Sequence, residues 1–232
     1  MEHIRPDKRR VHILLEGYVI DADYLYEALK PYLTPRSKVA VIAFSFREQY
    51  VSSAEEWEHF YGKENSLYYG GIVGAFRRYG ITDEDISFIN YFTDTTETAL
   101  EKIQNADILY FLGGLPDKMM ERIKAFGIYD AILQHGGVYM GYSAGAVIQL
   151  KEYHLSPDHD YPQFAYYEGF PFIDDFYLEV HYQESALQKA SIVRVLREKS
   201  KTVYATRLMS GAIIVDNGDV STPGDVQKFE CT

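Results

Sequence analysis

The chain alternates between short apolar runs and longer segments in which apolar residues recur at helical spacing. The short runs are typical of strands buried on both faces, and apolar residues three or four positions apart indicate helices. The predicted strands are 11–15, 38–44, 86–89, 107–112 and 138–140. The predicted helices between them are 23–32, 54–60, 66–79, 95–104 and 117–126.

This alternation predicts an α/β fold, a three-layer α-β-α sandwich with a mostly parallel central sheet. Shorter strands follow at 177–180, 202–204 and 211–215, with a last one near Val220, and Asn217-Gly218 is a strong hairpin signal before it. No repeat, low-complexity tract or linker is evident. We therefore expect one domain over residues 1–232, in which residues 1–10 form a flexible N-terminal extension.

Composition narrows the functional class. The chain has 34 acidic and 23 basic residues, a formal net charge of −11, so a polyanion is repelled and nucleic acid is not an expected partner. Its single cysteine, Cys231, excludes an internal disulfide and leaves no material for a Cys/His metal cage. Its apolar runs are too short for a signal peptide or a membrane span. We expect a cytoplasmic protein without metal or cofactor.

The segment Gly141-Tyr142-Ser143-Ala144-Gly145 matches the pattern G-x-S-x-G directly after an apolar strand. A sharp strand-to-helix turn strains the serine and requires small neighbours, which the flanking glycines and alanines provide. The turn also places the hydroxyl at a helix N-terminus, where backbone N–H groups favour developing negative charge. Ser143 is therefore the predicted nucleophile.

A serine nucleophile needs a base, and the base needs an orienting group. His181 ends an apolar strand, at the edge of the sheet where α/β sites assemble, whereas we expect His154 and His159 to lie in a solvated loop. The acid remains open among four carboxylates: Asp158, Asp160, Glu168 and Glu184. Gly113-Gly114 ends the fourth strand, either as a tight turn or as a source of oxyanion-hole N–H groups.

Several segments together resemble the peptidase E (aspartyl dipeptidase)/cyanophycinase family of serine peptidases, which has a class I glutamine amidotransferase-like (flavodoxin-like) fold. The matching segments are the strand ending in Gly113-Gly114, the run from Gly136 to Ala146, Asp160-Tyr161-Pro162, Val180-His181-Tyr182 and the closing hairpin from Ser210 to Gly218. The resemblance implies Ser143 as nucleophile, His181 as base and Asp160 as the third member. It also implies the Gly114 and Ala144 N–H groups as oxyanion donors, and short peptides as substrates.

The chain departs from the family pattern after the Gly-Gly turn. The family continues with Gly-Asn-Thr, whereas this chain has Leu115-Pro116-Asp117. The aspartyl dipeptidase branch uses an arginine beyond the histidine, for which Lys189 and Arg194 are the candidates here. The residues predicted to bind substrate are Gly113, Leu115, Asp117, Tyr142, Lys189 and Arg194.

Two other functions stay open at this stage. A catalytically weakened relative that binds a peptide or amino acid would explain the altered turn, and a related esterase or amidase would use the same serine. The scissile bond and the preferred side chain are undetermined, and a homodimer is an open arrangement.

Overall fold

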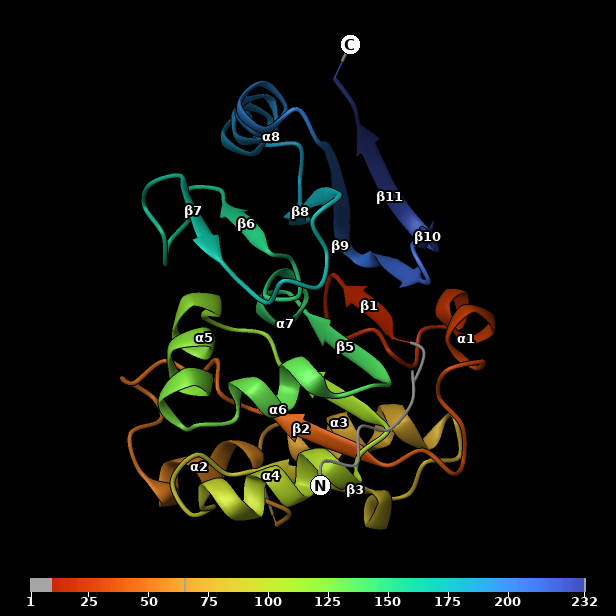
Figure 1. The fold of residues 1–232 in the computed structure, drawn as a ribbon, viewed down its shortest axis with the longest axis vertical. Helices are drawn as coiled ribbons and strands as arrows, with labels where there is room; N and C mark the ends of the chain where they lie inside the picture. The colour runs from red at the N-terminus through yellow and green to blue at the C-terminus, as the bar shows by residue number, and fades with distance from the viewer. Residues whose placement is uncertain (1–9, 65, 232) are drawn as a thin grey trace.

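The computed structural model describes residues 10–64 and 66–231 (Figure 1); most of the predicted N-terminal extension lies outside them. The helices are α1 (Asp23–Leu29), α2 (Ala54–Tyr61), α3 (Tyr69–Arg77), the 3-10 turn η1 (Asp83–Asp85), α4 (Thr96–Asn105), α5 (Pro116–Ala125), α6 (Tyr129–Gln134), α7 (Ala144–Val147) and α8 (Ala186–Lys199). The strands are β1 (Val11–Leu15), β2 (Val39–Ile42), β3 (Ile86–Ile89), β4 (Ile108–Phe111), β5 (Val138–Tyr142), β6 (Glu152–Leu155), β7 (Ala165–Glu168), β8 (Phe176–Tyr182), β9 (Thr202–Asp216), β10 (Asp219–Ser221) and β11 (Gly224–Phe229).

A parallel block of five strands forms the centre of the main sheet. Its order is β1-β5-β4-β2-β3, and every pairing within it is parallel. The carboxyl ends of these strands therefore share one edge, and β5, which leads into Ser143, lies between β1 and β4. The predicted mostly parallel sheet is confirmed.

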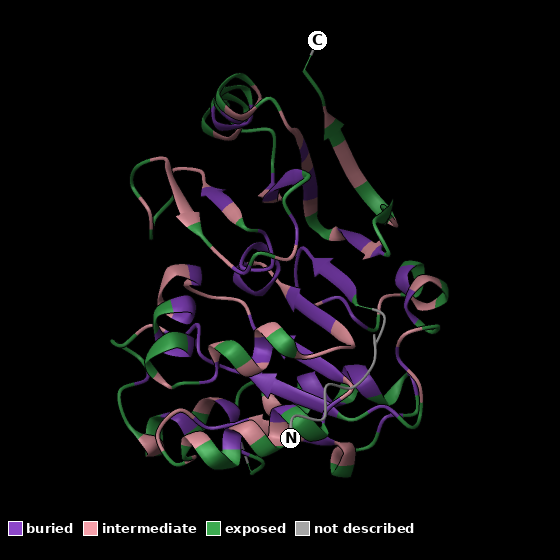
Figure 2. Cartoon of the chain, in the orientation of Figure 1, coloured by how far each residue is buried: buried purple, intermediate pink, exposed green. Residues whose placement is uncertain are grey.

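Helices pack on both faces of this block. In β2, Val39 and Val41 face the cluster formed with α1, α2 and α3, while Ala40 and Ile42 face the cluster formed with α4, α5 and α6. This alternation follows from the two-residue period of a strand. Figure 2 shows the resulting pattern, with buried strands in the middle and exposed residues on the outer sides of the helices. The α-β-α layering predicted from the sequence is confirmed.

Strand β9 extends the sheet beyond β1 and carries the C-terminal part of the molecule. It pairs antiparallel with β1, β10 and β11 and parallel with β8. The sequence predicted two strands here, whereas the structure has one long strand that bends between its two pairing regions. The predicted hairpin at Asn217-Gly218 is confirmed, with φ values of 52° and 86° that suit a tight β-turn.

The sequence did not predict several elements, which include η1 and β11 as well as those that follow. Helix α6 is short, and helix α8 carries apolar residues on its exposed side as well as its buried side, which blurs the helical pattern. The β6–β7 hairpin falls in a segment interpreted as a polar loop.

Within the described residues, no helix has the length and apolar character needed to cross a bilayer.

Candidate active site

Ser143 lies in a sharp turn between β5 and α7. Its backbone has φ 52° and ψ −113°, a conformation that residues with a side chain rarely adopt. A Cβ atom at Gly141 would lie 2.2 Å from the carbonyl oxygen of Gly145, and one at Gly145 would lie 2.1 Å from that of Phe111. Both glycines of the sequence pattern are therefore sterically required. The turn presents Ser143 at the carboxyl edge of the sheet.

A β-bulge in β8 brings His181 to Ser143. Between two register pairs with β9, strand β8 contains one residue more than its partner, and His181 stands in this bulge with φ 55°. A regular strand would direct His181 to the same face as Glu179, two residues earlier. The bulge turns the ring away from that face, and its Nε2 lies 2.8 Å from the Oγ of Ser143.

The other ring nitrogen of His181 contacts a carboxylate from the first strand. Glu16 directly follows β1, and its Oε1 is within hydrogen-bond distance of His181 Nδ1. The parallel strands β1 and β5 end in register, so the residues that follow them, Glu16 and Ser143, are neighbours at the sheet edge. The Glu16 side chain is fully buried, and the backbone N–H of Met209 donates to its second oxygen. Glu16 is thus held in a fixed orientation.

These contacts make a continuous chain from hydroxyl to imidazole to carboxylate. A carboxylate at Nδ1 fixes a proton there and leaves Nε2 free to accept the hydroxyl proton. That is the arrangement by which a serine becomes a nucleophile at neutral pH.

The structure places Asp160, predicted to support His181, away from the imidazole. Asp160 lies in the β6–β7 loop, where the Nε of Arg47 donates to it at 3.1 Å in a two-point ion pair. This pairing lowers the pKa of the Asp160 carboxyl and raises the pKa of Arg47. In the structure, the position at Nδ1 belongs to Glu16.

The other three carboxylates considered for this role have different partners or surroundings. Asp158 accepts backbone N–H groups within its own loop, and Glu184 pairs with Lys189 and Arg207. Glu168 is exposed at the end of β7. The carboxylate beside His181 was not among the predicted ones, all of which follow Ser143 in the chain. The available signal was an acidic residue directly after the first buried strand.

The Gly113-Gly114 turn follows β4, next to the nucleophile turn. Ser45 holds it from both sides: its Oγ donates to the Gly113 carbonyl at 2.6 Å, and its carbonyl accepts the Leu115 N–H at 2.8 Å. Gly114 has φ 142°, which glycine alone adopts readily. Ala144 is the first residue of α7, so its N–H faces the helix N-terminus beside Ser143. Both predicted oxyanion donors therefore stand at the same sheet edge as Ser143.

The residues that depart from the family pattern after this turn, Leu115-Pro116-Asp117, form the start of α5 and a contact to the β6–β7 loop. Leu115 is the N-cap of α5 and Pro116 its first residue, a position where the missing N–H of proline costs no helical hydrogen bond. The carboxylate of Asp117 accepts the Tyr161 hydroxyl at 2.5 Å. Burial and this hydrogen bond raise the pKa of Tyr161. Asp117 therefore anchors the β6–β7 loop.

The remaining predicted substrate residues are engaged in other contacts. Lys189 pairs with Glu184, and Arg194 pairs with Glu198 and stacks on Phe164. The Tyr142 ring lies against Gly113, and burial raises the pKa of its hydroxyl.

Two other histidines differ in environment. His154, expected to be solvated, is buried on β6, with its Nε2 2.7 Å from a Glu179 oxygen that also accepts the Ser156 hydroxyl. Its expected solvation is wrong because the segment is a strand packed on β8 rather than a loop. His159 is fully exposed, as expected.

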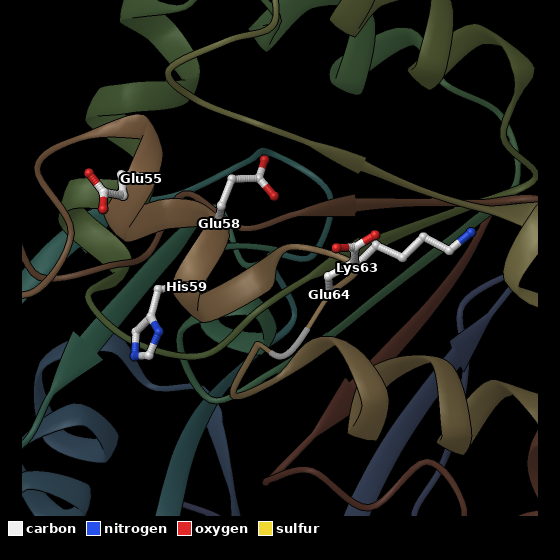
Figure 3. A pocket seen from close by; sticks show the side chains of 5 residues that line it. All are labelled: Glu55, Glu58, His59, Lys63 and Glu64. Atoms are coloured by element: carbon white, nitrogen blue, oxygen red, sulfur yellow. The ribbon is translucent and has the colours of Figure 1, made fainter.

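A separate set of residues lines a polar surface pocket. Figure 3 shows it on α2 and the segment that follows, lined by Glu55, Glu58, His59, Lys63 and Glu64. None of these residues follows a strand at the carboxyl edge beside Ser143. The lining of this pocket includes none of Ser143, His181 and Glu16.

The α-β-α fold and the serine, histidine and glutamate at its sheet edge define a hydrolase of the serine type. The model of peptidase family S51 matches residues 64–222. The chain belongs to this family, and the peptidase E resemblance inferred from the sequence is confirmed. It is accordingly a serine-type peptidase. No curated protein matches the chain at a significant level.

Solved structures of low sequence identity share the fold. A putative peptidase E from Listeria monocytogenes EGD-e has a TM-score of 0.65 at 18% identity, over 94% of this chain and 99% of that one. A peptidase from an acI-B1 Actinobacterium has a TM-score of 0.59 at 16% identity, over 96% of this chain and 95% of that one. The architecture thus extends over nearly the whole chain.

Proposed function

We propose that the protein hydrolyses short peptides through an acyl-enzyme on Ser143, with His181 as general base and Glu16 as the carboxylate that orients it. The observation that carries this proposal is the hydrogen-bond chain from Ser143 Oγ through both His181 nitrogens to the buried Glu16.

In the first half of the reaction, His181 takes the hydroxyl proton while Ser143 attacks the peptide carbonyl. The oxyanion is stabilised by the N–H groups of Gly114 and Ala144. Removal of one such donor typically costs roughly 3 kcal/mol of transition-state stabilisation. His181 then protonates the leaving amine, and the acyl-enzyme forms. In the second half, His181 activates a water that releases the acyl group and regenerates Ser143.

The β6–β7 loop favours short substrates. Asp160 binds Arg47 in the loop after β2, and Tyr161 binds Asp117 at the start of α5. These two contacts tie the loop to both segments that flank the Gly113-Gly114 turn. The loop therefore limits the length of chain that lies along this side of the sheet edge. A dipeptidase-like activity follows as the proposed specificity.

The test is a comparison of wild type with Ser143→Ala on a panel of dipeptides, with short acyl esters as a second panel. Wild type should cleave dipeptides, and Ser143→Ala should lose roughly 10³-fold or more in kcat, with an unchanged unfolding midpoint. Equal cleavage by Ser143→Ala would refute the proposal. Cleavage of esters alone would favour the esterase alternative, and binding without turnover would favour the binding-protein alternative.

A further inference from the structure

Two consecutive residues of β9 expose large apolar side chains, and one of them, Met209, lies next to the serine site. Among the described residues, Leu208 and Met209 on β9 are 53% and 51% exposed. Met209 also donates its backbone N–H to Glu16. Its sulfur lies over Gly17, where it would be 2.9 Å from a Cβ atom at that position. The Met209 side chain thus lies beside the carboxylate that supports His181, and it remains open to solvent.

The backbone of Met209 is strained. Its φ is 56°, in the left-handed region that long side chains rarely occupy. Ser143 and His181 also have positive φ, at 52° and 55°. Strained residues of this kind persist where surrounding contacts fix them, often at functional sites. At Met209, a strain that serves only the N–H contact to Glu16 would not require an exposed apolar side chain.

The order of strands at the sheet edge determines which part of a substrate would meet Met209. From β9 the order runs β1, β5, β4, so Ser143 stands between Met209 on one side and the Gly113-Gly114 turn on the other. The oxyanion lies toward the Gly-Gly turn. The leaving amine lies toward His181, which protonates it. The residue that carries the leaving amine therefore extends toward β1 and β9.

We propose that the Met209 side chain, extended by Leu208, forms the subsite for the residue on the C-terminal side of the scissile bond and selects apolar side chains there. This inference rests on the proposed peptidase function. The thioether is flexible and polarisable, so it adapts to leucine, methionine or phenylalanine. A charged leaving residue would gain no partner from either side chain. Peptides with an apolar leaving residue are the substrate class.

The experiment measures kcat/KM for two dipeptide series, Asp-X and Ala-X, with X as Leu, Phe, Gly, Glu or Lys. Burial of an apolar side chain in one subsite typically changes kcat/KM by roughly 10-fold or more. In each series that wild type cleaves, its kcat/KM should therefore be higher for X = Leu than for X = Gly by that factor. Met209→Asn keeps the backbone N–H and suits the left-handed conformation. It should reduce the Leu/Gly ratio to near one.

Val193→Asn is the matched control. Val193 is 62% exposed on α8, and its replacement should leave the ratio unchanged. A Leu/Gly ratio near one in wild type that cleaves peptides, or an unchanged ratio in Met209→Asn, would overturn the inference and leave the peptidase function standing. Failure of wild type to cleave any peptide would overturn both.

Native mass spectrometry is run on each variant. If Met209→Asn also lowers the oligomeric state, the residues contact a second copy and the subsite assignment is wrong.

Discussion

The position of Glu16 in the sheet explains the orienting role that we propose for it. Its carboxylate is buried, hydrogen-bonded to His181 on one oxygen and to the Met209 N–H on the other. Asp160, by contrast, is partly exposed and paired with Arg47. A buried carboxylate with both oxygens engaged holds an imidazole in one orientation far better than a surface group on a loop.

A second buried group, His12, governs stability rather than catalysis. It is 6% exposed on β1, stacks on Tyr139 and hydrogen-bonds Gln149. Burial lowers its pKa from 6.5 to about 4. The unfolded state therefore binds more protons between these two pH values, and the free energy of unfolding falls as pH falls through that window. The contribution amounts to about 3 kcal/mol, at 1.36 kcal/mol per pKa unit.

The measurement is an NMR titration of the histidine rings, with urea unfolding at pH 7 and pH 5. His12 should remain neutral until about pH 4. His12→Gln should remove part of the stability loss between the two pH values, whereas His59→Gln, at an exposed position on α2, should not. A His12 midpoint near 6.5 would contradict this assignment.

The sequence was informative for residues whose role depends on local geometry. The G-x-S-x-G pattern predicts Ser143 as the nucleophile because the turn needs glycine at both flanks, and the end of an apolar strand predicts His181 as the base. Glu16 depends on which strands are neighbours, and hydrophobic periodicity does not encode strand order. Proximity in the chain therefore favours carboxylates close to Ser143, whereas the sheet places β1, and Glu16 after it, beside β5.

At the scale of elements, the nucleophile turn depends on the close approach of α7 to β4. A Cβ atom at Gly145 would lie 2.1 Å from the Phe111 carbonyl oxygen, so the turn cannot accept one without movement. Gly145→Ala should therefore displace the turn, with loss of activity and a decrease of roughly 1–3 kcal/mol in the free energy of unfolding.

Gly74→Ala is the control for this substitution. Gly74 lies in α3, and a Cβ atom there would meet nothing within 4 Å. Because alanine favours a helix, this variant should gain roughly 0.5–1 kcal/mol. Urea unfolding and dipeptide cleavage give both readouts. A Gly145→Ala variant as stable and active as wild type would show that the turn tolerates a side chain.

The sequence predicts the regular central strands of the fold but not its irregular elements. The five central strands can be predicted from the sequence because they are apolar on both faces. The β8 bulge, the bend in β9 and the β6–β7 hairpin arise from tertiary pairing, and their segments mix polar and aromatic residues. The bulge and the bend place His181 and Met209 beside Glu16, so the least predictable elements complete the site.

At the scale of the whole molecule, the site is assembled from segments that are far apart in the chain. Four separate segments supply its residues: the end of β1 (Glu16), the β5–α7 turn (Ser143), β8 (His181) and β9 (Met209). They meet because the carboxyl ends of parallel strands share an edge and because β9 crosses beside β1. The family model begins at residue 64 and leaves out β1, so the match by itself does not include Glu16.

The identity of the orienting carboxylate is the most direct test of the proposed mechanism. The measurement is the rate at which a fluorophosphonate labels the protein, followed by intact-mass and peptide mass spectrometry. Wild type should carry one adduct, on Ser143. Glu16→Gln should label more slowly by a factor of roughly 10³ or more, because the imidazole loses its orienting partner. Asp160→Asn should lose far less. Labelling of Glu16→Gln at the wild-type rate, or a larger loss in Asp160→Asn, would contradict the Ser143–His181–Glu16 assignment.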